Sequence, residues 1–168
     1  MTQKSYDIGD RVYFIKPEDT ETKIENGPPS GGWVVERIDL FQTTLRQGIT
    51  GERSTFSNGC ALLTNSRVVN WKRSHCANVT LSMELSDKTG SNQIYFFQRQ
   101  ISEWIEDRPH EWFHLDSFRM VDVDIHQHRV TYEVVLRHRE SWHNYAAVQD
   151  SKSDIRVFLH ELRSSVDA

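Results

Sequence analysis

Residues 8–76 consist of short runs in which apolar and polar side chains alternate, with turn residues between the runs. One run lies over Asp10–Ile15 and a second over Trp33–Leu40, and Ser57-Asn58-Gly59 marks one of the turns. Alternation with a period of two is typical of strands, and strands spaced about ten residues apart predict a small barrel or sandwich. We expect four aliphatic side chains in its core: Ile38, Leu40, Leu62 and Val69.

From residue 77 the pattern changes to longer runs, some with helical spacing. Ser91 or Asn92 can cap the first helix, Arg108-Pro109 ends it, and Ser151 or Ser153 can open the last one. The elements expected in order are a strand over 79–85, a helix over 94–105, strands over 118–125 and 130–136, and a helix over 155–166. This β-α-β-β-α order predicts a ferredoxin-like unit that lacks its last strand.

The expected fold class is therefore α+β, with a small β-barrel over 1–76 and an α/β domain over 77–168. Residues 17–32 are acidic at first and then read G-P-P-S-G-G, which predicts a surface loop inserted into the barrel.

Composition narrows the possible functions. The chain has 20 basic and 24 acidic residues, whereas a dedicated nucleic-acid binder usually has a basic excess. No run of 18 apolar residues occurs, and the first ten residues do not form a signal peptide. Cys60 and Cys76 do not form a C-x-x-C motif, which favours a reducing compartment.

Candidate catalytic and metal-binding residues form no known motif. His126 and His128 have no third ligand at a suggestive spacing, so we expect water-exposed turn histidines. Glu133, His138 and Glu140 could support acid–base chemistry, but no nucleophile motif accompanies them. The sequence thus predicts a protein that is not an enzyme and needs no cofactor or metal; a hydrolase using such scattered side chains is the weakest hypothesis.

A small basic and aromatic cluster allows another function. Trp71 is followed by Lys72, Arg73 and His75, and Arg67 precedes it. Small five-stranded barrels bind oligonucleotides through such surfaces, although a solvated strand end explains the same residues.

The order of motifs in the first half resembles the soluble region after the pore helix of small-conductance mechanosensitive ion channels. Tyr6–Val12 reads Y-D-I-G-D-R-V, which is similar to the start of that region. Trp33–Arg46 resembles the next motif of the family, although Trp33 stands where the family has a glycine. Ser57–Leu63 lacks the proline of the family's turn, and Val69–Ser74 resembles the closing motif.

The second half resembles the plant and fungal branch of the same family. The helix of that branch ends in a motif that is similar to Ile105-Glu106 followed by His110–Phe113. A later strand of that branch ends in a motif that is similar to Leu136–Arg139 followed by Trp142–Asn144.

This resemblance implies an Sm-like barrel and a hollow α/β vestibule in a homo-heptameric channel that membrane tension opens, as under osmotic stress. The membrane would be reached through helices absent from this chain, in a plasma or organellar membrane, with this portion on the cytoplasmic or organelle-interior side. Ions would permeate, no nucleic acid would bind, and an RNA-binding Sm-like module is the alternative. The residues implied in structure and assembly are Gly9, Asp10, Thr43, Thr44, Asn58, Asn70 and Arg73.

Overall fold

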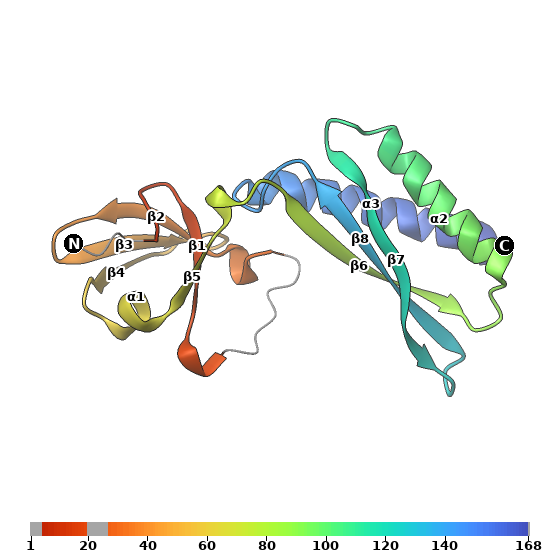
Figure 1. Ribbon diagram of the computed structural model, residues 1–168, viewed down its shortest axis with the longest axis horizontal. Helices are drawn as coiled ribbons and strands as arrows, with labels where there is room; N and C mark the ends of the chain where they lie inside the picture. The colour runs from red at the N-terminus through yellow and green to blue at the C-terminus, as the bar shows by residue number, and fades with distance from the viewer. Residues whose placement is uncertain (1–4, 20–26, 168) are drawn as a thin grey trace. The chain divides into compact units, whose positions relative to one another are not determined.

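The computed structural model describes residues 5–19 and 27–167, with side chains up to Ser165. The described chain contains two antiparallel sheets and α-helices, which confirms the α+β class (Figure 1). It divides into two compact units. The first unit comprises Met1–His75 together with Ser141–Tyr145, and the second comprises Cys76–Glu140 together with Ala146–Ala168.

The first unit is built on a five-stranded sheet with the order β4-β3-β2-β1-β5. Its strands are β1 (Arg11–Ile15), β2 (Trp33–Ile38), β3 (Gln42–Gln47), β4 (Arg53–Ser57) and β5 (Arg67–Asn70). Its helical elements are the 3-10 turns η1 (Pro17–Asp19), η2 (Pro29–Gly31) and η3 (Trp71–Arg73) and the short helix α1 (Ala61–Asn65). Within the described residues this sheet is open, with β4 and β5 as edges, so a closed Sm-like barrel is not confirmed.

The core of the first unit differs from the predicted one. Its buried side chains are Tyr6, Val12, Phe14, Val35 and Leu45. Ile38 and Leu62 only border this core, Val69 is half-buried, and Leu40 is 83% exposed. The prediction that all four aliphatic residues are core was therefore wrong.

A β-bulge in β2 explains much of this error. Val35 pairs with Leu45 and Ile38 pairs with Thr43, with a register shift between Val35 and Arg37. The extra residue of a bulge breaks strict alternation, so Val35 and Ile38 share the inward face although they are three positions apart. Leu40 lies beyond the end of β2, in the turn.

The predicted loop over 17–32 contains η1 at its start and η2 near its end. Residues 20–26 of that loop lie outside the described residues.

The second unit is built on a three-stranded sheet with the order β6-β8-β7. Its strands are β6 (Ala77–Ser86), β7 (Trp112–Asp124) and β8 (Arg129–His138), and its helices are α2 (Ser91–Glu106) and α3 (Tyr145–Asp167). The predicted chain order of strands and helices is confirmed; the ferredoxin-like description remains a prediction. Three details were wrong: Gly90 precedes α2 as its cap, β7 begins at Trp112 rather than at 118, and α3 begins before Ser151.

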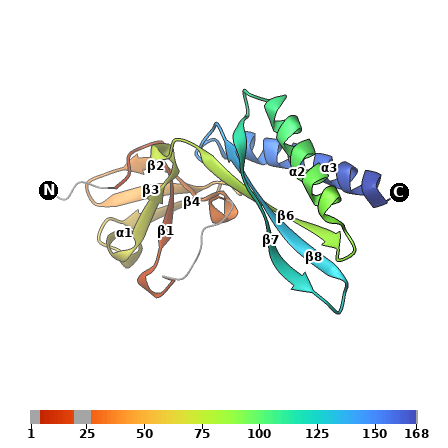
Figure 2. The same cartoon turned by 45° about the vertical axis from the view of Figure 1, so that its right-hand side comes forward.

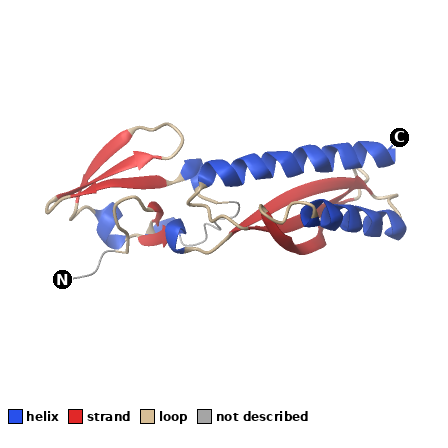
Figure 3. Ribbon diagram, turned by 90° about the horizontal axis from the view of Figure 1, so that it is seen from above, coloured by secondary structure: helices blue, strands red, loops and turns tan. Residues whose placement is uncertain are grey.

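Both helices of the second unit cover the same face of its sheet. Val79, Leu81, Met83 and Leu85 are buried on that face of β6, as the alternation predicted. Phe97, Ile101 and Ile105 of α2 and Ile155, Leu159 and Leu162 of α3 supply the buried helical stripes. The helices contact each other where Trp104 stacks on Phe158 with ring centroids 5.3 Å apart. Figure 2 shows them running along one side of the strands, and Figure 3 shows the length of α3.

The opposite face of the three-stranded sheet is polar and carries ion pairs between neighbouring strands. Arg119 donates to Glu133 at 2.8 Å, Arg137 to Asp116 at 2.9 Å, and Arg129 to Glu84 at 3.1 Å. Such a pattern is typical of an antiparallel sheet with one solvated face. None of the helices in the described part of the chain has both the length and the apolar content of a membrane-spanning segment.

Candidate functional site in the first unit

The carboxylate of Asp10 is the centre of a polar network at the start of β1. Asp10 is 3% exposed. Its Oδ2 accepts hydrogen bonds from the backbone N–H of Asp7 at 2.9 Å and from Nδ2 of Asn70 at 2.6 Å. The ammonium of Lys72 lies 3.3 Å from its Oδ1. We call these four residues the Asp10 network.

Local sequence chemistry builds this network. Gly9 has φ +86, a left-handed conformation that favours glycine, and its N–H donates to the carbonyl of Val35 at 2.7 Å. The N–H of Asp10 donates back to the carbonyl of Asp7 at 3.1 Å, which closes the turn into β1. Asn70 arrives opposite Val12 because β5 pairs with β1.

Asn70 uses both ends of its amide. Its Nδ2 donates to Asp10 and to the carbonyl of Ser5 at 3.2 Å, while its Oδ1 accepts from the backbone N–H of Lys72 at 3.1 Å. It thereby caps η3 and ties the end of β5 to the loop before β1.

The network stabilises the charged form of Asp10. Burial alone raises the pKa of its carboxyl, but the hydrogen bonds from Asp7 and Asn70 and the nearby Lys72 outweigh burial, so the pKa lies below its ordinary value. Asp10 is thus a compensated buried anion at neutral pH.

A second network surrounds the side chain of Asn58. Its Nδ2 donates to the carbonyls of Asp39 at 2.8 Å and Leu40 at 3.0 Å, and its backbone N–H donates to the carbonyl of Phe41 at 2.8 Å. The hydroxyl of Thr43, which is fully buried, donates to Oδ1 of Asn58 at 2.6 Å. Asn58 therefore fixes the turn between β2 and β3; we call this set the Asn58 network.

The seven residues singled out in the sequence are thus distributed between two networks and the surface. Gly9, Asp10 and Asn70 come together, and Arg73 lies at their border, 3.7 Å from the carboxylate of Asp7, with both side chains mostly exposed. Thr43 and Asn58 meet in the other network. Thr44 belongs to neither and lies 3.3 Å from the hydroxyl of Thr55 on β4.

Sequence reasoning missed the segment Ser141–Tyr145, which packs within the first unit and which we call the strap. Nε of Arg11 donates to the carbonyl of His143 at 3.0 Å, and the guanidinium lies 5.6 Å from the centroid of the Tyr145 ring. Burial, and then the positive charges of Arg11 and Lys72, lower the pKa of His143 against the opposing effect of Asp10. No local signal identifies contacts across this sequence distance.

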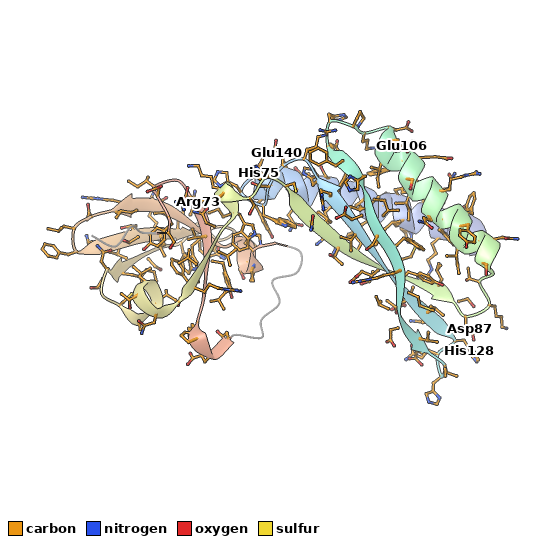
Figure 4. The ribbon with its side chains drawn as sticks, in the orientation of Figure 1. Arg73, His75, Asp87, Glu106, His128 and Glu140 are labelled. Carbon is orange, nitrogen blue, oxygen red and sulfur yellow. The ribbon has the colours of Figure 1, made fainter. Side chains whose placement is uncertain are left out.

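The basic and aromatic cluster does not form a stacking platform. Trp71 is 6% exposed and packs near Tyr13, with ring centroids 6.4 Å apart. A base needs an open aromatic face to stack on. Arg73 and His75, labelled in Figure 4, are exposed. The indole of Trp71, which precedes them in the chain, is buried and offers no such face.

The histidines and glutamates of the second unit are not assembled into a catalytic group. Glu133 pairs with Arg119, whereas His138 is buried, with Nε2 3.1 Å from the hydroxyl of Ser151. His128 lies 2.7 Å from the carboxylate of Asp87 at the tip of the β7–β8 hairpin (Figure 4). Among the described residues no three His, Cys, Asp or Glu side chains gather in a way that could hold a metal ion.

Comparison with solved structures identifies this arrangement of elements in ion channels. MSL1 of Arabidopsis thaliana matches with a TM-score of 0.66 and 10% identity over 97% of this chain and 52% of that chain. MscS of Helicobacter pylori in its closed state matches with a TM-score of 0.59 and 13% identity over 94% of this chain and 51% of that chain. No protein-family model and no curated protein matches the sequence.

These matches confirm, at the level of the fold, the resemblance to small-conductance mechanosensitive channels. The neighbours are ion channels rather than enzymes, and nothing in the comparisons supports an RNA-binding module. The chain spans about half the length of the solved chains that it matches.

Proposed function

We propose that this chain is the vestibule portion of a tension-gated ion channel, which joins the subunits and gives ions access to the pore. The observation that carries this proposal is the fold shared with MSL1 over 97% of the chain. A channel opens under tension when its open state occupies more membrane area, because tension then favours that state by a differential free energy. The gate lies in membrane helices outside this chain, in a plasma or organellar membrane.

The same proposal assigns a fold type to each of the two units. The first unit acts as an Sm-like β-domain and the second as a ferredoxin-like vestibule wall, with the division near residue 76. The sheet order β6-β8-β7 supports the second assignment, since α2 connects two strands that flank a third, as in a split β-α-β unit. The edge strands β4 and β5 support the Sm-like assignment of the first unit, because unpaired edges can join the sheets of neighbouring copies.

The assembly proposed is a homo-heptamer with side portals that ions cross. The polar outer face of the three-stranded sheet suits a water-filled wall, because its charges are already paired across strands. The residues Gly9, Asp10, Asn58 and Asn70 hold backbone geometry, and none of them performs covalent chemistry.

The test is patch-clamp recording from the complete protein with its membrane helices, reconstituted in liposomes under stepped suction. We expect tension-gated currents, and we expect Asn70→Ala to shift opening or inactivation while assembly survives, because Asn70 ties β5 to the loop before β1. Thr44→Ala is the matched control, since Thr44 makes one long contact with Thr55 outside both networks. If the complete protein gave no tension-gated current at verified expression, the proposed function would be wrong.

A further inference from the structure

The strap is held to the rest of the first unit at two points. Trp142 is buried, and its ring packs so closely on Gly27 that a Cβ at this glycine would clash with it. Arg11 supplies the second point: its Nε donates to the carbonyl of His143 at 3.0 Å, and its Nη1 donates to the carbonyl of Gly31. One guanidinium therefore binds the strap and the loop before β2 together.

The ring of His143 lies where a neutral imidazole fits better than a charged one. The residue is half-buried, and its Nδ1 is buried with no hydrogen-bond partner among the described residues. An imidazolium carries N–H groups on both nitrogens, so in the protonated ring Nδ1 is a buried donor without an acceptor. A buried donor left unsatisfied destabilises the state that buries it, so protonation opposes binding of the strap.

The charges around this ring oppose protonation as well. Arg11 of β1 and Lys72 of η3 are positive, and Asp10 is the anion that acts against them. The carboxylate of Asp10 is already bound within the Asp10 network, so it has little capacity to compensate another cation. Arg46 of β3 adds positive charge near Arg11, although an ion pair at 2.8 Å partly neutralises it. The strap itself contributes no carboxylate, and its Tyr145 is uncharged in acid.

The affinity of His143 for a proton therefore differs between a bound and a released strap. Burial, and then the nearby cations, hold the pKa of the ring below 6.5 while the strap is bound. In a released strap the ring faces water and its pKa returns to about 6.5. Because the released form binds the proton more readily, release becomes more favourable as the pH falls below about 6.5. The effect levels off once the pH passes the pKa of the bound form.

We propose that the strap is an acid-sensitive latch, which binds the first unit while His143 is neutral and leaves it when the ring is protonated. The carbonyl that Arg11 binds belongs to the same residue as the ring, so the hydrogen bond and the position of the ring are lost together. The strap connects β8 to α3 in the chain, so its release turns this connection into an unattached segment. This inference goes beyond the proposed function and does not depend on it.

The test is hydrogen exchange by mass spectrometry on the full chain, corrected for the intrinsic effect of pH on exchange, between about pH 7.5 and about pH 5.5. Peptides that cover residues 141–145 report opening of the strap. Because release is linked to the uptake of one proton, we expect the opening constant to rise toward a limit of about tenfold per pH unit below about pH 6.5.

Substitutions at position 143 separate charge from shape. His143→Gln keeps the backbone carbonyl and takes up no proton in this range, so its strap should not show the rise. His143→Arg carries a fixed positive charge and should expose the strap already at about pH 7.5. The matched control is His75→Gln, which replaces an exposed histidine of the same unit and should behave as the parent. His138 is present in every chain, so its own titration cancels in the comparison.

Three results would overturn the inference: no rise in the parent, an equal rise in the parent and His143→Gln, or a strap in His143→Arg that is as protected as in the parent. Circular dichroism verifies that each variant is folded, and His143→Asn is the second neutral variant if His143→Gln is not. None of these measurements involves the tension-gated current, so the two proposals fail separately.

Discussion

Replacing Asp10 by alanine removes the acceptor at the centre of the Asp10 network. The N–H of Asp7, Nδ2 of Asn70 and the ammonium of Lys72 then lose a partner that lay 2.9, 2.6 and 3.3 Å away. A buried donor left unsatisfied costs about 1–3 kcal/mol. Asn70 keeps the carbonyl of Ser5 and Lys72 is half exposed, so the losses do not add fully, and we expect about 2–4 kcal/mol in the free energy of unfolding.

The effect of this substitution should depend on pH with a definite sign. The pKa of Asp10 in the folded chain lies below its ordinary value of 3.8. Its stabilisation is therefore complete above the unfolded pKa of about 4 and is lost as the pH falls through the folded pKa. The difference in stability between the parent and Asp10→Ala should accordingly be constant at neutral pH and shrink in strong acid.

The assay is hydrogen exchange of β1 amides by mass spectrometry as a function of urea, which reports opening of the first unit separately from the second. The control is Asp7→Ala, whose side chain is 81% exposed and pairs with Arg73 at 3.7 Å. We expect that control to change stability by under about 0.5 kcal/mol. A cost for Asp10→Ala no larger than for Asp7→Ala would refute this account of the network.

Three further outcomes follow from the same structure. Asn58→Ala should cost about 1–3 kcal/mol and speed hydrogen exchange over 39–43, because the turn loses its amide partner. Leu45→Ala should cost about 2–5 kcal/mol in urea unfolding and Leu40→Ala under about 0.5, and the reverse order would contradict the bulged register of β2. Burial lowers the pKa of His138 below 6.5, so the stability of the second unit should fall as the pH drops below about 6.5, and His138→Gln should flatten this dependence in second-unit peptides.

Much of the second unit could be predicted because its periodicities are unambiguous. Val79, Leu81, Met83 and Leu85 alternate without interruption, and the apolar residues of α2 recur with helical spacing. The prediction placed the start of α3 at Ser151 or Ser153 and so missed residues 145–150, although Asn144 is itself a favoured capping residue and Ala146 and Ala147 favour a helix.

The core of the first unit was harder to predict, because one bulge changes which residues of an alternating run face inward. The sequence of β2 alternates as one continuous strand, but the bulge between Val35 and Arg37 shifts the register. After the bulge the even-numbered positions face inward, whereas before it the odd-numbered positions do. Gly9, Asp10, Asn58 and Asn70 were found through their motif, and the structure supplies their hydrogen-bond partners. The contact of Arg11 with the strap is set by chain folding alone, so no sequence spacing could have indicated it.

The strap has a consequence for modularity. The chain passes from one unit to the other between His75 and Cys76, between Glu140 and Ser141, and again between Tyr145 and Ala146. A chimaera that exchanges everything after residue 75 as one cassette would import a foreign strap. Its backbone carbonyl at position 143 and its side chain at position 145 would then have to take the places that His143 and Tyr145 hold beside Arg11. A workable exchange must keep Ser141–Tyr145 with its own first unit. Among relatives, residues 11 and 145, whose side chains are in contact, should change together.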